Sequence, residues 1–299
     1  MGYLYFMKAN TASRTAQYMA LYRAMESGRA NRKRLFTDPY AILFLDKGYR
    51  LACRLSSFPP AERFFYYLLQ RRIPGSLASG LARTRYIDDL LEKTIREGTR
   101  QVIIPGAGFD TRSLRLDYLK GVPVIEIDHP DTARRKLAAL KMAENPDGNT
   151  RYLQADLDKQ DLRTLFREKG IDLSLRTTLI WEGVTNYLQR GAVDKTFSLM
   201  RQFPEGSSII FTYIDQKVLD EPGAFFGAGR LLKDLEALEE KWTCGFYPRE
   251  MPSYLGSFGI RLLEDKGAAE YRERYLPERK SILKGYEFYR VAIGVLNGE

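Results

Sequence analysis

Residues 101–110 read QVIIPGAGFD, and residues 122–131 read VPVIEIDHPD. Each stretch is a short apolar run, typical of a buried strand, that ends in residues unsuited to a strand interior. The first runs into a glycine turn that carries Asp110, and the second ends in Glu126 and Asp128. A glycine turn after one strand and an acid after the next predict the nucleotide-binding edge of a doubly wound α/β fold.

The chemistry of this turn indicates which nucleotide-like group it suits. A dinucleotide fingerprint has a third glycine, which lets the helix pack closely so that its N-terminal amides hold a pyrophosphate. Here Thr111 stands at that position, and Asp110 places a negative charge where phosphates would lie. S-adenosylmethionine has no phosphate, and its methionyl end carries a sulfonium and an ammonium. The turn therefore favours this group over NAD.

The rest of the chain after Gln101 alternates apolar strand segments with helical segments. Seven strands with helices between them predict a mostly parallel sheet covered by helices on both faces. The expected strands are 101–105, 122–127, 150–154, 177–182, 207–214, 259–264 and 288–296. The expected helices are 81–97, 111–119, 131–144, 158–169, 190–203 and 229–242.

Two regions lie outside this alternation. Residues 1–80 contain no convincing strand and are predicted to form a helical extension ahead of a domain at 81–299. Within this extension, the segment PPAERFFYYLLQRRI at 59–73 is aromatic and basic, and Pro74-Gly75 ends it. Residues 215–256 are too many for a plain connection. We interpret them as a lid insertion over the strand ends, where ligands bind in such sheets.

The bulk composition of the 299 residues is that of a globular protein, with 44% hydrophobic and 28% charged residues. No apolar run approaches the ~20 residues of a membrane span. The N-terminal MGYLYFMKAN has neither the long apolar stretch nor the cleavage site of a signal peptide. Cys53 and Cys244 match no metal spacing and are expected to be buried free thiols. We expect a cytoplasmic protein without a membrane partner or a metal.

The formal net charge of +9 raises the question of an anionic partner. The basic residues are spread along the chain, and the densest cluster, RANRKR at 29–34, contains no aromatic residue for base stacking. A solvated basic surface is therefore favoured over a nucleic-acid site, and an acidic substrate is a third explanation.

Four positions carry the candidate chemistry of the cofactor site. Gly106 and Gly108 let the chain turn sharply and bring backbone close to a ligand. Glu126 and Asp128 share one face of a strand; we choose Asp128 for the ribose hydroxyls, and one of the two acids can instead cap the helix near Asp131.

Two further acids follow later strands. Asp156 stands where an adenine amino group needs an acceptor, or it caps the helix at 158–169. Glu182 leaves an apolar central strand and faces either the cleft or a partner. His129 is the single histidine, so any imidazole base must be this residue, although a structural histidine in the loop is the favoured interpretation.

These stretches together resemble the leucine carboxyl methyltransferase family, including its bacterial O-methyltransferases associated with polyketide-type metabolites. The resemblance covers nearly the whole chain and is most specific in three motifs, GAGFDTR, EIDHP and EGVTNYL. Further matching stretches are TASRTAQYMALYRAMES, LFTDPYAILFL, ARTRYIDDLL and the ADL at 155–157. The departures are Pro105, where an aliphatic residue or glycine is more usual, and EID in place of EVD.

The resemblance implies S-adenosyl-L-methionine as the cofactor and a set of residues that bind it. It implies that Arg83 binds the cofactor carboxylate, that Asp128 holds the ribose, and that Asp156 and Leu157 lie near the adenine. It further implies Arg23 on the N-terminal helix, Gly106 and Glu182. The turn residues Ala107, Gly108 and Asp110 complete the candidate cofactor site.

The function expected from these residues is an O-methyltransferase that acts on a carboxylate of a small molecule or peptide, which needs no general base. A phenol or alcohol acceptor would need one, and His129 or Glu182 would then be catalytic. A nicotinamide-dependent oxidoreductase is disfavoured by Asp110 and Thr111. A non-catalytic relative that binds the cofactor or an RNA is the remaining alternative.

Overall fold

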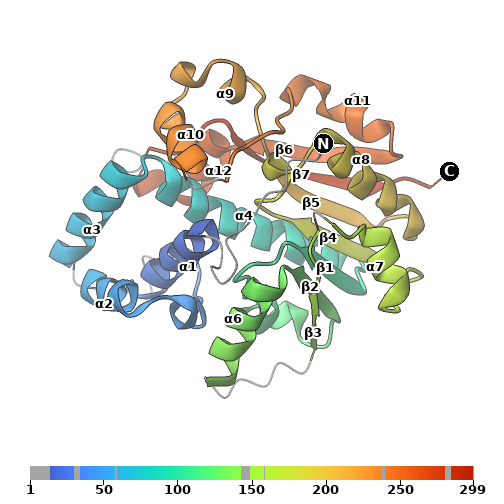
Figure 1. Ribbon diagram of the computed structural model, residues 1–299, viewed down its shortest axis with the longest axis horizontal. Coiled ribbons are helices and arrows are strands. Elements are labelled where there is room, and N and C mark those ends of the chain that lie inside the picture. The colour runs from blue at the N-terminus through green and yellow to red at the C-terminus, as the bar shows by residue number, and fades with distance from the viewer. Residues whose placement is uncertain are drawn as a thin grey trace.

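The computed structural model describes residues 14–29, 34–57, 59–142, 149–157, 159–237, 240–279 and 284–298. The N-terminal MGYLYFMKAN and residues 30–33 of the basic cluster lie outside these ranges. Within them the chain folds as an α/β structure in which helices flank one central sheet (Figure 1).

The sheet has seven strands in the described ranges, in the order β3-β2-β1-β4-β5-β7-β6. Strands β1 to β5 are parallel, and β7 pairs antiparallel with both β5 and β6. The prediction of a mostly parallel, seven-stranded sheet is confirmed. The bounds are β1 Gln101–Pro105, β2 Val124–Asp128, β3 Thr150–Gln154, β4 Thr177–Trp181, β5 Ser208–Ile214, β6 Ile260–Gly267 and β7 Tyr289–Leu296.

Helices account for most of the remaining described chain, and the first strand begins only at Gln101, as expected. The α-helices are α1 Arg14–Ser27, α2 Lys47–Ser56, α3 Pro59–Arg72, α4 Ser76–Arg96, α5 Arg112–Arg115, α6 Pro130–Met142, α7 Leu162–Glu168, α8 Arg190–Leu199, α9 Lys217–Asp220, α10 Ala228–Ala237, α11 Met251–Gly256 and α12 Ala268–Tyr275.

Helix α4 begins at Ser76 rather than 81, and α10 ends at Ala237 rather than 242. Two further helices differ from the prediction for local reasons. The helix expected at 111–119 is the short α5 followed by a 3-10 turn at Asp117–Leu119, because Leu116 adopts an extended backbone between them. The helix expected at 158–169 begins at Leu162, since the Asp161 carboxylate accepts the Thr164 N–H at 3.2 Å and so caps the helix there. Helix α12 was not predicted.

Both faces of the sheet are buried, which explains the uninterrupted apolar runs of its central strands. Val102 and Ile104 pack in one core with α1, α4 and α12, whereas Ile103 between them points into a second core with α7, α8 and α11. Cys53 and Cys244 are buried and free, as expected. In the described ranges no helix combines the length and the apolar character needed to cross a membrane.

The carboxyl ends of β1, β2, β4 and β5 meet at one edge of the sheet, because these strands are parallel. Helix α1 and the N-terminal half of α4 lie beside this edge, and α10 from the 215–256 insertion approaches it from the other side (Figure 1). The fold therefore encloses the strand ends where the candidate site was predicted.

Candidate functional site

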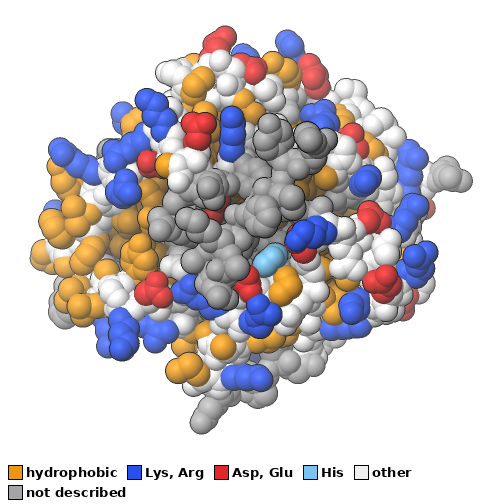
Figure 2. Space-filling view, viewed as in Figure 1, with side chains coloured by type: hydrophobic (Ala, Val, Ile, Leu, Met, Phe, Trp, Pro, Cys, Tyr) orange, Lys and Arg blue, Asp and Glu red, His pale blue; other side chains and the backbone are white. Residues whose placement is uncertain are grey.

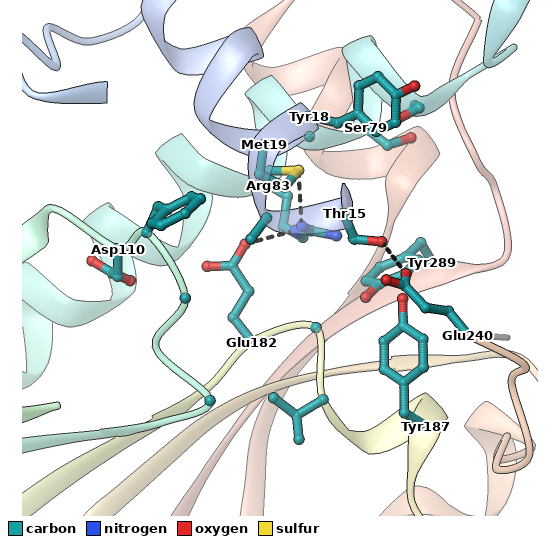
Figure 3. A pocket seen from close by; sticks show the side chains of 18 of the residues that line it. Thr15, Tyr18, Met19, Ser79, Arg83, Asp110, Glu182, Tyr187, Glu240 and Tyr289 are labelled. Atoms are coloured by element: carbon teal, nitrogen blue, oxygen red, sulfur yellow. Dashed lines mark hydrogen bonds and ion pairs between the residues drawn. The ribbon is translucent and has the colours of Figure 1, made fainter. Parts of the chain in front are cut away.

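A cavity of about 660 Å³ lies at the carboxyl edge of the sheet. Its walls come from the loops after β1, β2 and β4, from α1 and α4, and from the 215–256 insertion. Figure 3 shows side chains from these elements directed toward one another around it. The cavity contains most of the predicted cofactor residues, namely Arg23, Arg83, Gly106, Ala107, Gly108, Asp110, Asp128 and Glu182.

The glycine turn after β1 forms one wall. Gly106 and Gly108 have φ angles of +69° and +53°, which side chains rarely permit. A Cβ on Gly106 would lie only 2.5 Å from Cγ2 of Val184, so the close approach of two loops also requires glycine there. The Gly106 N–H donates to the Ile127 carbonyl at 2.8 Å, which ties the turn to β2.

Asp128 stands opposite this turn at the end of β2. One carboxylate oxygen accepts the Gly108 N–H, and the other accepts the His129 N–H at 2.6 Å. Burial raises the pKa of the Asp128 carboxyl above its ordinary value, although these two N–H groups oppose the shift. The acid and the glycine turn thus form one unit, with the Asp128 carboxylate at the cavity wall.

Glu126, the other acid of β2, does not line the cavity. Its carboxylate pairs with the Lys136 ammonium on α6, and Ser113 Oγ lies 3.4 Å from it. Lys136 also donates to the Asp110 carbonyl, so the pair fixes the turn from behind. Glu126 therefore supports the turn from behind, and of the two acids only Asp128 lines the cavity, where it can contact a ligand.

Arg83 and Glu182 form an ion pair in the cavity wall. Arg83 Nε donates to Glu182 Oε1 at 2.9 Å, and Arg83 Nη2 lies 3.4 Å from the Met19 sulfur (Figure 3). The Arg83 guanidinium also lies over the Tyr289 ring, 4.7 Å from its centroid. A cation and an anion are thus held side by side next to the glycine turn.

Arg112, which the sequence analysis missed, connects the acids of the site. Its guanidinium donates to Asp88 at 2.9 Å, to Glu182 Oε2 at 2.8 Å and to Asp110. Burial alone would raise the pKa of the Asp110 carboxyl, but Arg112 and Lys136 lower it to about 2. Arg112 and Arg83 likewise hold the pKa of Glu182 below its ordinary value despite burial. Both acids are therefore ionised at neutral pH.

Arg23 reaches the cavity from α1 and also supports the turn. Its Nε donates to Asp38 at 2.8 Å and its Nη2 to the Phe109 carbonyl at 2.5 Å. Asp38 additionally accepts the Thr111 hydroxyl at 2.7 Å. The buried Asp38 thus joins the N-terminal helices to the glycine turn.

Three predicted residues lie outside the cavity lining. Asp156 follows β3 and pairs with Lys159 at 2.7 Å, while Leu157 packs against the core beside α7. His129 accepts the Asp131 N–H on Nδ1 at 3.3 Å. Their assignments to the adenine and to catalysis remain predictions.

The other end of the cavity is lined by the insertion and by aromatic side chains. Tyr187, Trp242 and Tyr286 form much of this wall. Glu240 also lines it and accepts the Thr15 hydroxyl at 2.7 Å, and Asp234 of α10 lies in the same wall (Figure 3). This end combines apolar surface with two carboxylates. None of the predicted cofactor residues lies in this part of the cavity wall.

Comparison with known sequences identifies the family to which this chain is similar. The sequence model described as leucine carboxyl methyltransferase matches residues 16–201. A Streptomyces avermitilis protein with the provisional name S-adenosyl-L-methionine-dependent methyltransferase is 31% identical over 212 residues, which cover 70% of this chain and 72% of that protein. A Mycobacterium sp. (strain MCS) protein of the same provisional name is 31% identical over 52% of this chain; the match spans 62% of the mycobacterial protein, somewhat less than two thirds of its length.

Comparison with solved structures supports the fold. A provisionally named methyltransferase from Thermobifida fusca matches with a TM-score of 0.60, covering 97% of each chain at 17% sequence identity. A DUF574 family protein from Streptomyces avermitilis matches with a TM-score of 0.59, covering 92% of this chain and 100% of that one at 16% identity. At these identities the likeness concerns the arrangement of the chain.

Proposed function

Because this chain belongs to the leucine carboxyl methyltransferase family, we propose that it is an S-adenosyl-L-methionine-dependent methyltransferase whose acceptor is a carboxylate of a small molecule or peptide. The methyl donor is S-adenosyl-L-methionine, which the names of the curated relatives specify. When bound, this donor supplies an electrophilic methyl group on a sulfonium.

The residues of the cavity fit this donor. Arg83 offers a buried cation for the methionyl carboxylate, and Glu182 beside it offers an anion for the ammonium. Asp128 at the end of β2 offers a carboxylate for ribose hydroxyls. Asp110, ionised in the glycine turn, would repel a pyrophosphate, which disfavours a nicotinamide dinucleotide. The Arg83–Glu182 pair next to the turn is the observation that carries the proposal.

A carboxylate acceptor is favoured because Glu182 and His129, the two candidate general bases predicted from the sequence, are poorly suited to take a proton from an acceptor. Since Glu182 is held by two arginines and its pKa is lowered, it is a poor proton acceptor. His129 does not line the cavity. A carboxylic acid is already ionised at neutral pH, so the enzyme needs only to align its oxygen with the methyl group and exclude water.

A hydroxyl acceptor is the second candidate, and one feature favours it. Glu240 and Asp234 stand in the wall of the aromatic end of the cavity, where a base for a phenol or alcohol would be needed. An anionic acceptor would be repelled by these two carboxylates unless it also carried a positive group.

The experiment that separates the two measures methyl transfer from labelled donor into a panel of acids, phenols and RNA. A base-labile methyl ester whose formation survives His129→Asn and Glu240→Gln within about tenfold supports the carboxylate acceptor. A base-stable ether together with a loss of about 10²–10⁴ in Glu240→Gln supports the hydroxyl acceptor. Label in RNA would contradict both.

A further inference from the structure

Helices α2 and α3 present large apolar side chains to solvent. Among the described residues, the large hydrophobic side chains that are exposed gather on these two helices; Met142 and Phe226 are the others. Figure 2 shows this patch as hydrophobic atoms on the left of the molecule, over α2 and α3. The exposed residues are Leu51 (58%), Leu55 (45%), Phe64 (57%), Tyr67 (53%) and Leu68 (43%). Monomeric soluble proteins rarely expose a contiguous apolar patch of this kind unless the patch is an interaction site.

These exposed residues form helix faces that are separate from the faces packed on the core. Leu51 and Leu55 are one turn apart on α2, and Phe64 and Leu68 are one turn apart on α3, so each pair shares a helix face. The inward side of the same helices is occupied by other residues, among them the buried Tyr66. The exposed faces are therefore additional to those that hold the helices in place.

The same two helices are strongly basic. They carry six Lys or Arg side chains and one carboxylate, Glu62, and so hold +5 of the chain's formal net charge of +9. Arg29 lies 2.5 Å from Glu62, which reduces the influence of this single acid. The basic residues are Lys47, Arg50, Arg54, Arg63, Arg71 and Arg72.

We propose that this α2–α3 surface docks on an anionic lipid bilayer, which departs from the expectation, based on the sequence alone, of no membrane partner. Apolar side chains flanked by cations are the features that bind helices into the interface of such a membrane, where the rings and leucines enter the acyl boundary and the arginines meet lipid phosphates. A second copy of the chain fits less well, because two surfaces of charge +5 repel each other. A nucleic acid would satisfy the arginines but leave Leu51, Leu55 and Phe64 without an apolar partner.

The position of α3 connects this surface to the cavity. Arg72 at the end of α3 and Ile73 after it line the cavity. Docking through α2 and α3 would therefore bring the cavity close to the bilayer, from which an amphiphilic acceptor is able to enter. The docking itself does not depend on the proposed function and is measurable without donor or acceptor.

The test is co-sedimentation of the full chain with vesicles of phosphatidylcholine alone and of phosphatidylcholine with phosphatidylglycerol. We expect binding to the anionic vesicles at least about tenfold tighter than to the neutral ones, and weaker as salt is added. The double variant Phe64→Glu, Leu68→Glu should lose about tenfold or more, since two exposed apolar anchors become anions. Met142→Glu, which changes an exposed apolar residue on α6, is the matched control and should bind like the unmodified protein.

A second pair of variants tests the charges without altering the apolar face. Arg54→Gln with Arg63→Gln should weaken binding to anionic vesicles several-fold, whereas Lys195→Gln on α8 should not. Equal binding to neutral and anionic vesicles, or unchanged binding of both double variants, would overturn the proposal. Concentration-dependent dimerisation or RNA binding that these variants abolish, without lipid binding, would assign the surface to those partners instead.

Discussion

Arg83 on α4 donates from Nε to Oε1 of Glu182, which follows β4, at 2.9 Å, although the two residues are 99 positions apart. The second Glu182 oxygen accepts from Arg112 at 2.8 Å, so the carboxylate is held from two sides. The pair therefore places a cation and an anion at fixed positions beside the glycine turn. A zwitterionic methionyl group would find both charges already oriented, which lowers the cost of ordering them on binding.

Replacing Arg83 by alanine should weaken binding of S-adenosylhomocysteine by about 1.5–3 kcal/mol, because a charge-assisted hydrogen bond to the ligand carboxylate is lost. The matched control is Arg96→Ala, on the same helix, whose side chain is 76% exposed and pairs with Glu92. Calorimetric titration of both variants checks this. Equal affinities in the two variants, with intact circular dichroism, would place the carboxylate elsewhere.

Substituting Gly106 by alanine should impair both folding and binding. The new Cβ would meet Val184 Cγ2 at 2.5 Å and would stand on a backbone with φ of +69°. Gly121 has a φ of +82° but no heavy atom within 4 Å of an added Cβ, so Gly121→Ala isolates the backbone cost of about 1 kcal/mol. We expect Gly106→Ala to cost more than this in urea denaturation and to be relieved in part by Val184→Ala. An equal cost at the two glycines would show that the loop contact is unimportant.

Arg112→Met should destabilise the protein by about 3–5 kcal/mol, since the buried Asp110 loses the cation that it pairs with, while Glu182 keeps only Arg83 and Asp88 keeps only Arg115. Asp88, Asp110 and Glu182 all accept from this one guanidinium. Lys120→Met, which removes an exposed cation paired with the exposed Asp117, should leave the denaturation midpoint nearly unchanged. Chemical denaturation of both variants is the measurement. A loss below about 1 kcal/mol for Arg112→Met would contradict its role as the connector of the site.

Glu26 makes the stability of the N-terminal helices depend on pH. Burial raises the pKa of its carboxyl from 4.5 to about 7, although the Leu35 N–H and Arg29 favour the ionised form. Between these two values the folded chain binds the proton more tightly than the unfolded chain does, so this contribution to stability falls as the pH rises from about 4.5 to about 7.

The variant Glu26→Gln carries no charge but keeps an acceptor for the Leu35 N–H, which lies 2.7 Å from the Glu26 carboxylate. Relative to this variant, the unmodified protein should lose about 2–3 kcal/mol between about pH 5 and about pH 8. Glu97→Gln, at an exposed position, should show no such difference. Parallel pH profiles for the unmodified protein and Glu26→Gln would refute this assignment.

The sheet and the glycine turn were predictable because their signals are local. Apolar runs of strand length, the turn at Gly106–Gly108 and the acid Asp128 each lie within a few residues of the strand that positions them. Of the two acids of β2, Asp128 lines the cavity and Glu126 does not, and the assignment of Asp128 to the ribose stays a prediction.

The contacts of Arg112 with Asp88 and Glu182 were not predictable in the same way. Asp88 and Arg112 are 24 residues apart, and Arg112 and Glu182 are 70 apart. The three residues lie in three separate motifs, and neither the motifs nor the periodicity predicts that the residues meet. Tertiary packing of α4 against the sheet decides that contact. The basic and aromatic composition of 59–73 was visible, but which of its side chains face solvent depends on how α3 packs.

The central claim is that the cavity at the strand ends binds S-adenosyl-L-methionine through Arg83, Glu182 and Asp128. Calorimetric titration of the unmodified protein with S-adenosylhomocysteine, and separately with NAD, tests it most directly. We predict saturable binding of S-adenosylhomocysteine that is weakened in Asp128→Ala by about 1–3 kcal/mol, and no binding of NAD. Saturable NAD binding without any response to S-adenosylhomocysteine would contradict the account.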